Sequence, residues 1–167
     1  MQENIFDELK MKGTHAYMVT DIRKIHREGL AVGHARNKKT QQIDYAHMQP
    51  ENDFVFYLGN FYGDGSIVST ARDLALWSRA LKNCTLLPCE VQAEAFVPFA
   101  ENKVNYGFGW KISRNARSEK VISHSGGHPG NQHIIYKILD RDVTLIYLSN
   151  FEGEQNRAVM NGLIAML

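Results

Sequence analysis

The sequence predicts an α+β fold, with helical and irregular structure over residues 1–100 and antiparallel strands plus a closing helix over 101–167. Three observations predict it. A capped, amphipathic segment follows Thr70, two β-rich runs flank a turn near Asp140, and spaced apolar residues over 156–167 indicate a terminal helix.

The clearest predicted helix begins after Thr70. Its hydroxyl can cap the first turn, and Asp73, three residues later, completes a capping-box pattern. Leu74, Trp77 and Leu81 then recur with helical spacing, which predicts that one apolar stripe faces inward.

The second half of the chain has strand patterning. Alternating aromatic residues predict a strand over 106–112, and shorter apolar runs predict strands over 120–124, 133–139 and 143–148. Polar residues 140–142 separate the last two runs, so these two should form a hairpin.

The chain has nearly equal numbers of positive and negative residues, so it has no strong overall electrostatic field. Lys and Arg total 19, Asp and Glu total 18, and the formal net charge is +1. Such a chain has no overall attraction for nucleic acid or for an anionic membrane, and we expect neither as a partner. Its apolar runs are too short to cross a bilayer.

Two cysteines, Cys84 and Cys89, lie five residues apart. Their spacing permits a small disulfide, but we expect two free thiols. Two cysteines are also too few for a structural zinc site, which normally has four ligands.

The stretch over 121–131 is the richest in potential chemistry. Apolar strand residues lead into His124-Ser125-Gly126-Gly127, and Pro129-Gly130 follow. Glycines let a ligand approach the backbone and leave N–H groups available as donors. A histidine and a hydroxyl beside such donors can bind a carboxylate or stabilise an oxyanion. A strand that ends in an ordinary glycine turn is the alternative.

Two other types of site fit this stretch poorly. His124, His128 and His133 could be taken for metal ligands, but His-x-x-x-His binds metal best on a helix, and the glycines and proline oppose a helix here. A phosphate-binding loop would need a Lys-Ser/Thr pair after the glycines, which is absent. We therefore expect no metal and no cofactor.

Five stretches, in this order, resemble conserved segments of the serine β-lactamase-like hydrolases, the superfamily of penicillin-binding proteins, D-Ala-D-Ala carboxypeptidases and related esterases. They are residues 5–14 (IFDELKMKGT), 30–34 (LAVGH), 63–74 (GDGSIVSTARDL), 106–110 (YGFGW) and 124–127 (HSGG). The last would be the His-x-Gly form of the third catalytic motif. Glu8, Lys10 and His34 depart from the residues usual in these segments.

The resemblance implies an antiparallel sheet packed against helices, of which this chain would be the C-terminal portion, without the N-terminal strands. The superfamily's Ser-x-x-Lys and Tyr-x-Asn motifs occur nowhere in the 167 residues. Ser113-Arg114-Asn115 has the letters of a variant motif, but it lies in the wrong order, and we expect it to be a hairpin turn.

The same resemblance assigns roles to residues at the third motif. His124 would position a substrate carboxylate or the leaving group, and Ser125 would donate to the same carboxylate. Gly126 would permit close approach, and the Gly127 N–H would be one donor of the oxyanion hole. His124 and Gly127 are thus the candidate catalytic residues, and all four are candidate substrate-binding residues.

Several functional expectations follow. We expect the chain to be inactive alone and its parent to act on a small-molecule or peptide substrate, namely a β-lactam, a D-Ala peptide or an ester. As is usual for members of this family, the parent protein would be bacterial and exported, to the periplasm or outside the cell. The alternative is a non-catalytic module that binds a carboxylate or peptide at the His-Ser-Gly-Gly strand edge. In the family the strand matching 143–149 lies beside an N-terminal strand, so we expect its bare edge to form a homodimer, by edge pairing or a swap.

Overall fold

The computed structural model describes residues 1–16, 29–52, 65, 67–99 and 105–167, and its mixture of helices and antiparallel strands confirms the predicted α+β class. The start of the segment over 63–74 that resembles the family lies almost wholly outside the described residues. The chain divides into two compact units, which are described separately. Unit 1 comprises Met1–Thr14, Ser69–Ser125 and Ile134–Ile146, and unit 2 comprises His15–Val68, Gly126–His133 and Tyr147–Leu167.

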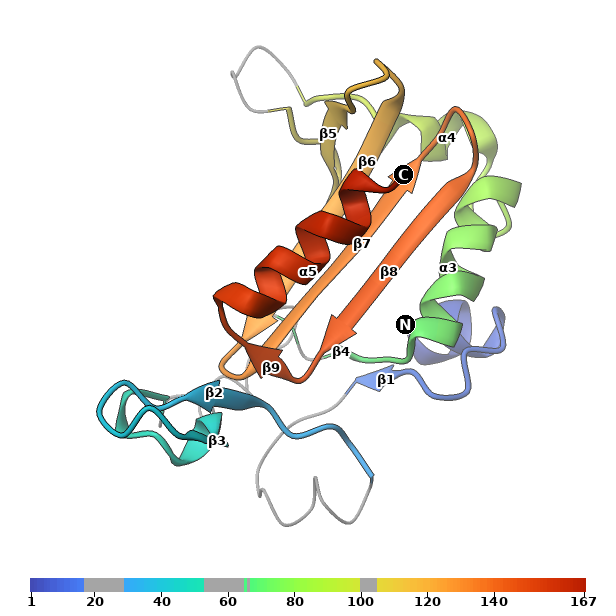
Figure 1. The fold of residues 1–167 in the computed structure, drawn as a ribbon. Helices are drawn as coiled ribbons and strands as arrows, with labels where there is room; N and C mark the ends of the chain where they lie inside the picture. Colours follow the sequence, from blue (N-terminus) through green and yellow to red (C-terminus); the bar gives the residue numbers. More distant parts are fainter. Residues whose placement is uncertain (17–28, 53–64, 66, 100–104) are drawn as a thin grey trace. The chain divides into compact units, whose positions relative to one another are not determined.

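Figure 1 shows the elements in chain order. The strands are β1 (His15–Ala16), β2 (His34–Arg36), β3 (Ile43–Tyr45), β4 (Ile67–Val68), β5 (Lys111–Arg114), β6 (Lys120–His128), β7 (Asn131–Ile138), β8 (Val143–Ser149) and β9 (Phe151–Glu152). The helices are α3 (Ala71–Asn83), α4 (Cys89–Glu94) and α5 (Glu154–Ala165), and the short helical segments are η1 (Gln2–Asp7), η2 (Ala46–Met48) and η3 (Pro50–Asn52).

The main sheet has the order β5-β6-β7-β8. Consecutive strands pair, and short turns join them, as expected for an antiparallel meander. β5 pairs with β6 from Lys111 opposite Ser123 to Arg114 opposite Lys120. The predicted strands over 120–124, 133–139 and 143–148 therefore correspond to β6, β7 and β8, although β6 is longer than expected.

Smaller sheets complete unit 2. β2 pairs antiparallel with β3 and parallel with β9, and β1 pairs with β4. The N-terminal turn of α5 is anchored by Asn156, which is buried. Its amide group donates to Gln132 and to the Phe151 carbonyl, both at 2.8 Å, and its side-chain oxygen accepts from the Tyr147 hydroxyl.

The hydrophobic core of unit 1 forms where β5 and β6 meet α3 and α4. Its buried centre is Trp110, Ile112 and Ile122. Phe96 packs edge-on against Trp110, with ring centroids 6.2 Å apart, and Leu81 contributes from α3. Ile112 and Ile122 are register partners, so their side chains share one face of the sheet.

Helix α3 begins as predicted. The Thr70 hydroxyl accepts from the Asp73 N–H at 3.1 Å, and the Asp73 carboxylate in turn accepts from Gly13 N–H and Thr14 Oγ1 at 2.7 and 2.8 Å. The predicted apolar stripe is only half-buried. The most buried positions of the helix are instead Asp73, Ser78 and Ala80, because polar groups of α3 form specific bonds to neighbouring elements.

One such bond network surrounds Lys137 on β7, whose side chain is only 6% exposed. Its ammonium donates to Ser78 Oγ at 3.0 Å, to Asp142 Oδ1 at 2.9 Å and to Thr144 Oγ1 at 3.3 Å. Lys82 contacts the other oxygen of Asp142 at 2.6 Å. The network fastens α3 to the β7–β8 hairpin, and it provides the partners that a buried charge requires.

The predicted strand over 106–112 is wrong for most of its length, because β5 begins only at Lys111. The chain turns instead, and Gly107 N–H donates to the Trp110 carbonyl at 2.8 Å. Gly109 has a φ of +77°, a conformation that favours glycine. The aromatic residues alternate as in a strand, but the two glycines between them allow the chain to form a turn instead.

The expected turn at Ser113-Arg114-Asn115 is also displaced. Ser113 and Arg114 lie in β5, opposite Val121 and Lys120. The turn begins at Asn115, whose side-chain oxygen accepts from the N–H groups of Arg117 and Glu119, both at 3.0 Å. An asparagine that bonds to the backbone ahead of it is a common way to start a turn.

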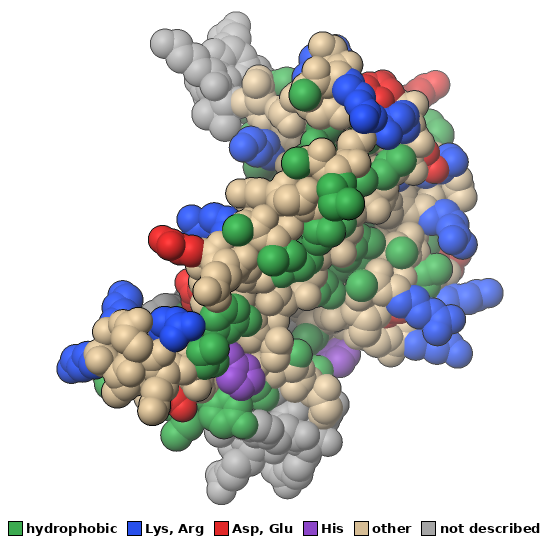
Figure 2. Space-filling view, viewed as in Figure 1, with side chains coloured by type: hydrophobic (Ala, Val, Ile, Leu, Met, Phe, Trp, Pro, Cys, Tyr) green, Lys and Arg blue, Asp and Glu red, His purple; other side chains and the backbone are tan. Residues whose placement is uncertain are grey.

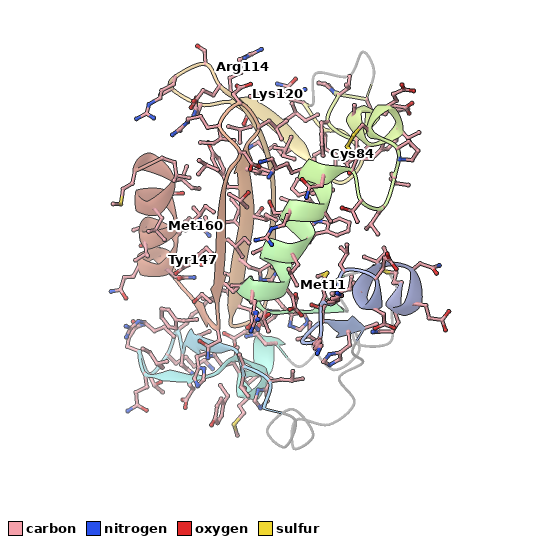
Figure 3. The ribbon with its side chains drawn as sticks, turned by 90° about the vertical axis from the view of Figure 1, so that its right-hand side faces the viewer. Met11, Cys84, Arg114, Lys120, Tyr147 and Met160 are labelled. Atoms are coloured by element: carbon pink, nitrogen blue, oxygen red, sulfur yellow. A yellow bond between two sulfur atoms is a disulfide. The ribbon has the colours of Figure 1, made fainter. Side chains whose placement is uncertain are left out.

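The expectation of two free thiols is wrong, because Cys84 and Cys89 form a disulfide. Cys84 ends α3 in a left-handed conformation, with φ +50°, which reverses the chain toward α4. The two Cα atoms then lie 5.1 Å apart, within the range that a disulfide spans. Figure 3 shows Cys84 at the end of α3.

The surface agrees with the balanced composition. In Figure 2, Lys and Arg side chains are spread around the visible face rather than gathered into one patch. No helix among the described residues is long and apolar enough to span a membrane.

The Lys137 network predicts an acid-dependent stability. Hydrogen bonds from Lys82, and then from Lys137, hold the pKa of Asp142 below its ordinary value. A lowered folded-state pKa stabilises the fold at neutral pH, and this contribution disappears as the pH falls through that pKa. Asp142→Asn should therefore lower the free energy of unfolding at neutral pH. This loss of stability relative to wild type should become smaller below about pH 4.

Urea unfolding followed by circular dichroism at several pH values measures this difference. Asp44→Asn, on the exposed strand β3, is the control because it changes the net charge equally. A difference between wild type and Asp142→Asn that stays constant with pH would contradict the prediction.

Candidate active site

The candidate site residues lie in succession on strand β6. The sequence suggests that the strand ends at the glycines, but β6 continues through Gly126 and Gly127 to His128, and the turn is formed by Pro129 and Gly130. Glycines are poor strand residues, yet here they lie on one arm of a tight hairpin whose other arm, β7, supplies the ladder.

The register of the β6–β7 hairpin is fixed at both ends. At one end the two-residue turn makes His128 and Asn131 opposite partners, and at the other Leu139 N–H donates to the Lys120 carbonyl at 2.9 Å. In this register Gly126 lies opposite His133. A Cβ at position 126 would overlap the His133 ring, so a side chain there would require this ring to move.

The direction of each backbone group on β6 follows from the ladder. Ile112 N–H donates away from β6, to the Asn105 carbonyl at 2.8 Å. In an antiparallel pair the bonded residues alternate, so Lys111 is the β5 residue that bonds to β6, opposite Ser123. Ser123 therefore directs its backbone groups toward the β5 side, and Gly127, four residues on, does the same.

The β5 ladder ends before the candidate residues. Its last registered pair is Lys111 with Ser123, so β5 places no ladder partner opposite Ser125 or Gly127. Gly127 N–H consequently points from the strand edge on the side away from β7. A Cβ at position 127 would meet only the Asn131 carbonyl oxygen, at 3.5 Å, so the described neighbours allow a side chain there.

His124 and Ser125 line the same cavity in unit 1, which has a volume of about 520 Å³. Their side chains leave opposite faces of β6, because successive strand residues alternate. Both are exposed, and the Tyr106 ring meets that of His124 edge-on, with centroids 6.1 Å apart. The structure thus brings the two predicted side chains to one cavity at the edge of the sheet.

The cavity also contains polar residues that the sequence did not single out. They are Lys111, Ser113 and Ser123. Ser123 was adjacent to the predicted motif, but Lys111 lies 13 positions before His124 in the sequence. Only the β5–β6 register, which the sequence does not specify, brings Lys111 to this place.

Among the described residues, no group of three or more His, Cys, Asp or Glu side chains is arranged to hold a metal ion.

The hairpin turn depends on Gly130. Its φ of +80° favours glycine, and an added Cβ would overlap the backbone of Gly33 and His34. Its N–H also donates to Glu152 at 3.0 Å. Both the conformation and the close approach therefore require glycine at this position.

Gly130→Ala should lower the free energy of unfolding by about 2 kcal/mol or more, because a strained φ and a backbone overlap add together. Gly162→Ala is the matched control. It lies within α5 with nothing near its Cβ position, so it should stabilise the chain by roughly 0.5–1 kcal/mol. Urea unfolding measures both variants, and equal effects of the same sign would refute the assignment.

Comparisons with known proteins agree on one family. The family model described as Beta-lactamase matches residues 1–166. Penicillin-binding protein 4* of Bacillus subtilis (strain 168) is 35% identical over 107 residues, which cover 62% of this chain and 24% of that protein.

Solved structures share the fold. The penicillin binding protein of Bacillus halodurans superposes with a TM-score of 0.72 at 17% identity, over 99% of this chain and 48% of its own. The octameric penicillin-binding protein homologue from Pyrococcus abyssi gives 0.70 at 18% identity, over 90% of this chain and 33% of its own. D-amino acid amidase from Ochrobactrum anthropi SV3, solved with D-phenylalanine, gives 0.60 at 22% identity, over 89% of this chain and 46% of its own. The chain spans less than half the length of each of these relatives.

Proposed function

We propose that His124 to Gly127 form one wall of an acyl-transfer site, because the chain belongs to the beta-lactamase family of serine hydrolases. The observation that carries the proposal is the open edge of β6, where the β5 ladder has ended and Gly127 N–H points outward. On this proposal the substrate lies along that edge, and its carbonyl oxygen accepts from Gly127.

The proposed roles follow from the geometry of the strand. Gly127 N–H supplies one donor to the oxyanion, and such donors act best when they are already oriented before the reaction. His124 and Ser125, which line one cavity, bind the part of the substrate beyond the scissile bond. Gly126, which has no side chain, leaves room for the His133 ring beside the strand.

Covalent catalysis requires groups that these 167 residues do not supply in the family's spacing. No Ser-x-x-Lys and no Tyr-x-Asn occurs in the sequence. Without a nucleophile and its base no acyl-enzyme forms, and the loss of one oxyanion donor alone costs about 10²–10³ in turnover. We therefore propose that this chain holds the substrate-facing wall and that hydrolysis needs a serine and a lysine from another segment.

The chain alone should not hydrolyse nitrocefin or p-nitrophenyl acetate above the buffer rate. Absorbance assays on the purified chain measure this, with the Gly127→Pro variant alongside, since proline removes the proposed N–H donor. Turnover that follows the chain through purification and falls in Gly127→Pro would contradict the prediction.

The substrate class is proposed by analogy with the relatives. Their names refer to penicillin binding and to a D-amino acid amidase. A β-lactam, a D-alanyl peptide or an ester fits the same wall. A non-catalytic carboxylate-binding module is the second candidate, favoured by the cavity at His124 and Ser125, which exists in this chain without a nucleophile. An in-frame Ser-x-x-Lys upstream in the gene would favour the hydrolase, whereas an in-frame stop codon just before Met1 would favour the module.

We also propose that strand β8 mediates self-association. β8 is the last strand of the sheet, and in the described part of the chain it pairs only with β7. Because Leu139 N–H donates to β6, even-numbered residues of β7 bond to β8, and the even-numbered residues of β8 direct their N–H groups outward. Leu148, 41% exposed, is one of these.

Light scattering should show a dimer whose fraction increases with protein concentration. Leu148→Pro should abolish it, because proline removes an outward N–H without taking a bond from the β7 ladder. Leu148→Val keeps that N–H and should still dimerise. A wild-type chain that stays monomeric at high concentration would exclude the proposal.

A further inference from the structure

We propose that the Cys84–Cys89 disulfide is a redox switch for the candidate site, and that α4 transmits its state to the Tyr106 side of the cavity. The switch rests on the proposed function, because it regulates the same site. In the oxidised chain α4 holds Tyr106 in place, and in the reduced chain α4 detaches more often, so that the cavity binds its ligand less tightly.

The bridge joins two helices at a place that a reductant can reach. Cys84 is the C-cap of α3, and Cys89 is the first residue of α4. Cys89 is exposed and Cys84 is half-buried. Exposed disulfides are reduced more readily than buried structural ones, and they are the ones that serve in regulation. The position of this bridge therefore suits a reversible role.

Helix α4 depends on its attachments, because it has only six residues and its N-cap makes no side-chain hydrogen bond. A helix this short is not stable by itself. Gln92, which is buried, donates from its side-chain amide to the Leu81 carbonyl and lies 3.9 Å from Cys84 Sγ. Phe96 then packs on Trp110. The bridge and the Gln92 bond thus attach α4 to the end of α3, and their loss would let α4 open locally.

The segment that follows α4 lies against the turn that precedes β5. A Cβ at Gly107 would overlap the carbonyl oxygen of Ala95, so the two backbones are in direct contact. Phe99 N–H donates to the Tyr106 carbonyl at 2.8 Å. Because these contacts join backbone to backbone, opening of α4 would release the turn that carries Tyr106.

Tyr106 connects this turn to the candidate site. It lines the cavity together with His124, and its ring meets the His124 ring edge-on, with centroids 6.1 Å apart. Tyr106 therefore forms one side of the cavity whose other side is β6. The bridge, α4, the turn and the cavity all lie within unit 1, so the connection follows one compact unit from end to end.

The redox step uses a dithiol reductant, such as dithiothreitol or a dithiol protein. One thiolate of the reductant attacks Cys89 Sγ, the bond between the two cysteines breaks, and Cys84 leaves as a thiolate that takes up a proton. The second thiol of the reductant then attacks the mixed disulfide and releases Cys89 as a thiol. The chain gains two electrons and two protons, and the reductant is oxidised to a disulfide.

The first test follows amide hydrogen exchange in the whole ¹⁵N-labelled chain, before and after reduction with dithiothreitol. Exchange at Phe99 and Gly107, whose N–H groups are bonded across the proposed connection, should become roughly tenfold faster or more, because the bridge no longer restrains α4. Leu139 N–H, which bonds to Lys120 in the main sheet, is the internal reference. Unchanged exchange at Phe99 and Gly107, or an equal rise at Leu139, would overturn the switch.

The second test titrates both redox states with N-acetyl-D-alanyl-D-alanine, a probe that dithiothreitol does not attack, and follows the amide shifts of residues 124–127. The reduced chain should bind roughly threefold more weakly or less tightly still, because only chains with Tyr106 in place are competent to bind. The double variant Cys84→Ser/Cys89→Ser is the matched control. It should behave like the reduced chain, and dithiothreitol should not change its affinity.

The outcomes separate the switch from the proposed function. Equal affinities in the oxidised and reduced chains, with shifts at residues 124–127 in both, would overturn the switch and leave the proposed function supported. A double variant that binds as tightly as the oxidised chain would also overturn the switch. If the probe shifted these residues in neither state, the proposed function would fail, and the switch that acts on its site would fail with it.

Discussion

The place where the β5 ladder stops determines most of what this chain can do chemically. β5 and β6 pair over only four residues on each strand, from Lys111–Ser123 to Arg114–Lys120. β6 then continues to His128, and over this part β7 is its only partner among the described strands of the main sheet. A strand that is paired on both sides has no unbonded backbone N–H groups, whereas a strand with one unpaired side offers every second N–H to a ligand. The turn at Gly107–Gly109, which delays the start of β5, therefore creates the edge on which the candidate site lies.

The hairpin turn at Pro129-Gly130 is the second constraint, because it fixes which residues of β6 face which way. A shift of one residue would exchange the two faces of the strand. It would also exchange the residues that direct their backbone toward β5 with those that direct it toward β7. Gly130, which cannot carry a side chain in its position beside Gly33, thus secures the orientation of Gly127 N–H without touching it.

Polar contacts, rather than the apolar stripe, fasten α3 to its neighbours. Asp73 bonds to Gly13 and Thr14 at one end of the helix, and Ser78 bonds to Lys137 and Thr144 at its middle. Such bonds are directional, and an unpaired buried charge is costly, so they specify one position of the helix along the hairpin more narrowly than apolar contact does. Lys137 and Lys111 illustrate two different uses of lysine. One is buried and fully bonded, and the other is exposed beside a cavity.

The sequence by itself determined the fold class, the capped start of α3, the three long strands and the family, because these depend on local periodicity, capping and short motifs. It also brought His124 to Gly127 forward as candidates, since glycines beside a histidine and a serine form a recognisable local pattern. Only the tertiary structure decided that the glycines lie within a strand, that Cys84 and Cys89 are bridged, and that Lys111 stands opposite Ser123. The physical reason is that strand register, left-handed turns and cross-strand pairs depend on residues far apart in the sequence, and no local pattern in this chain encodes them.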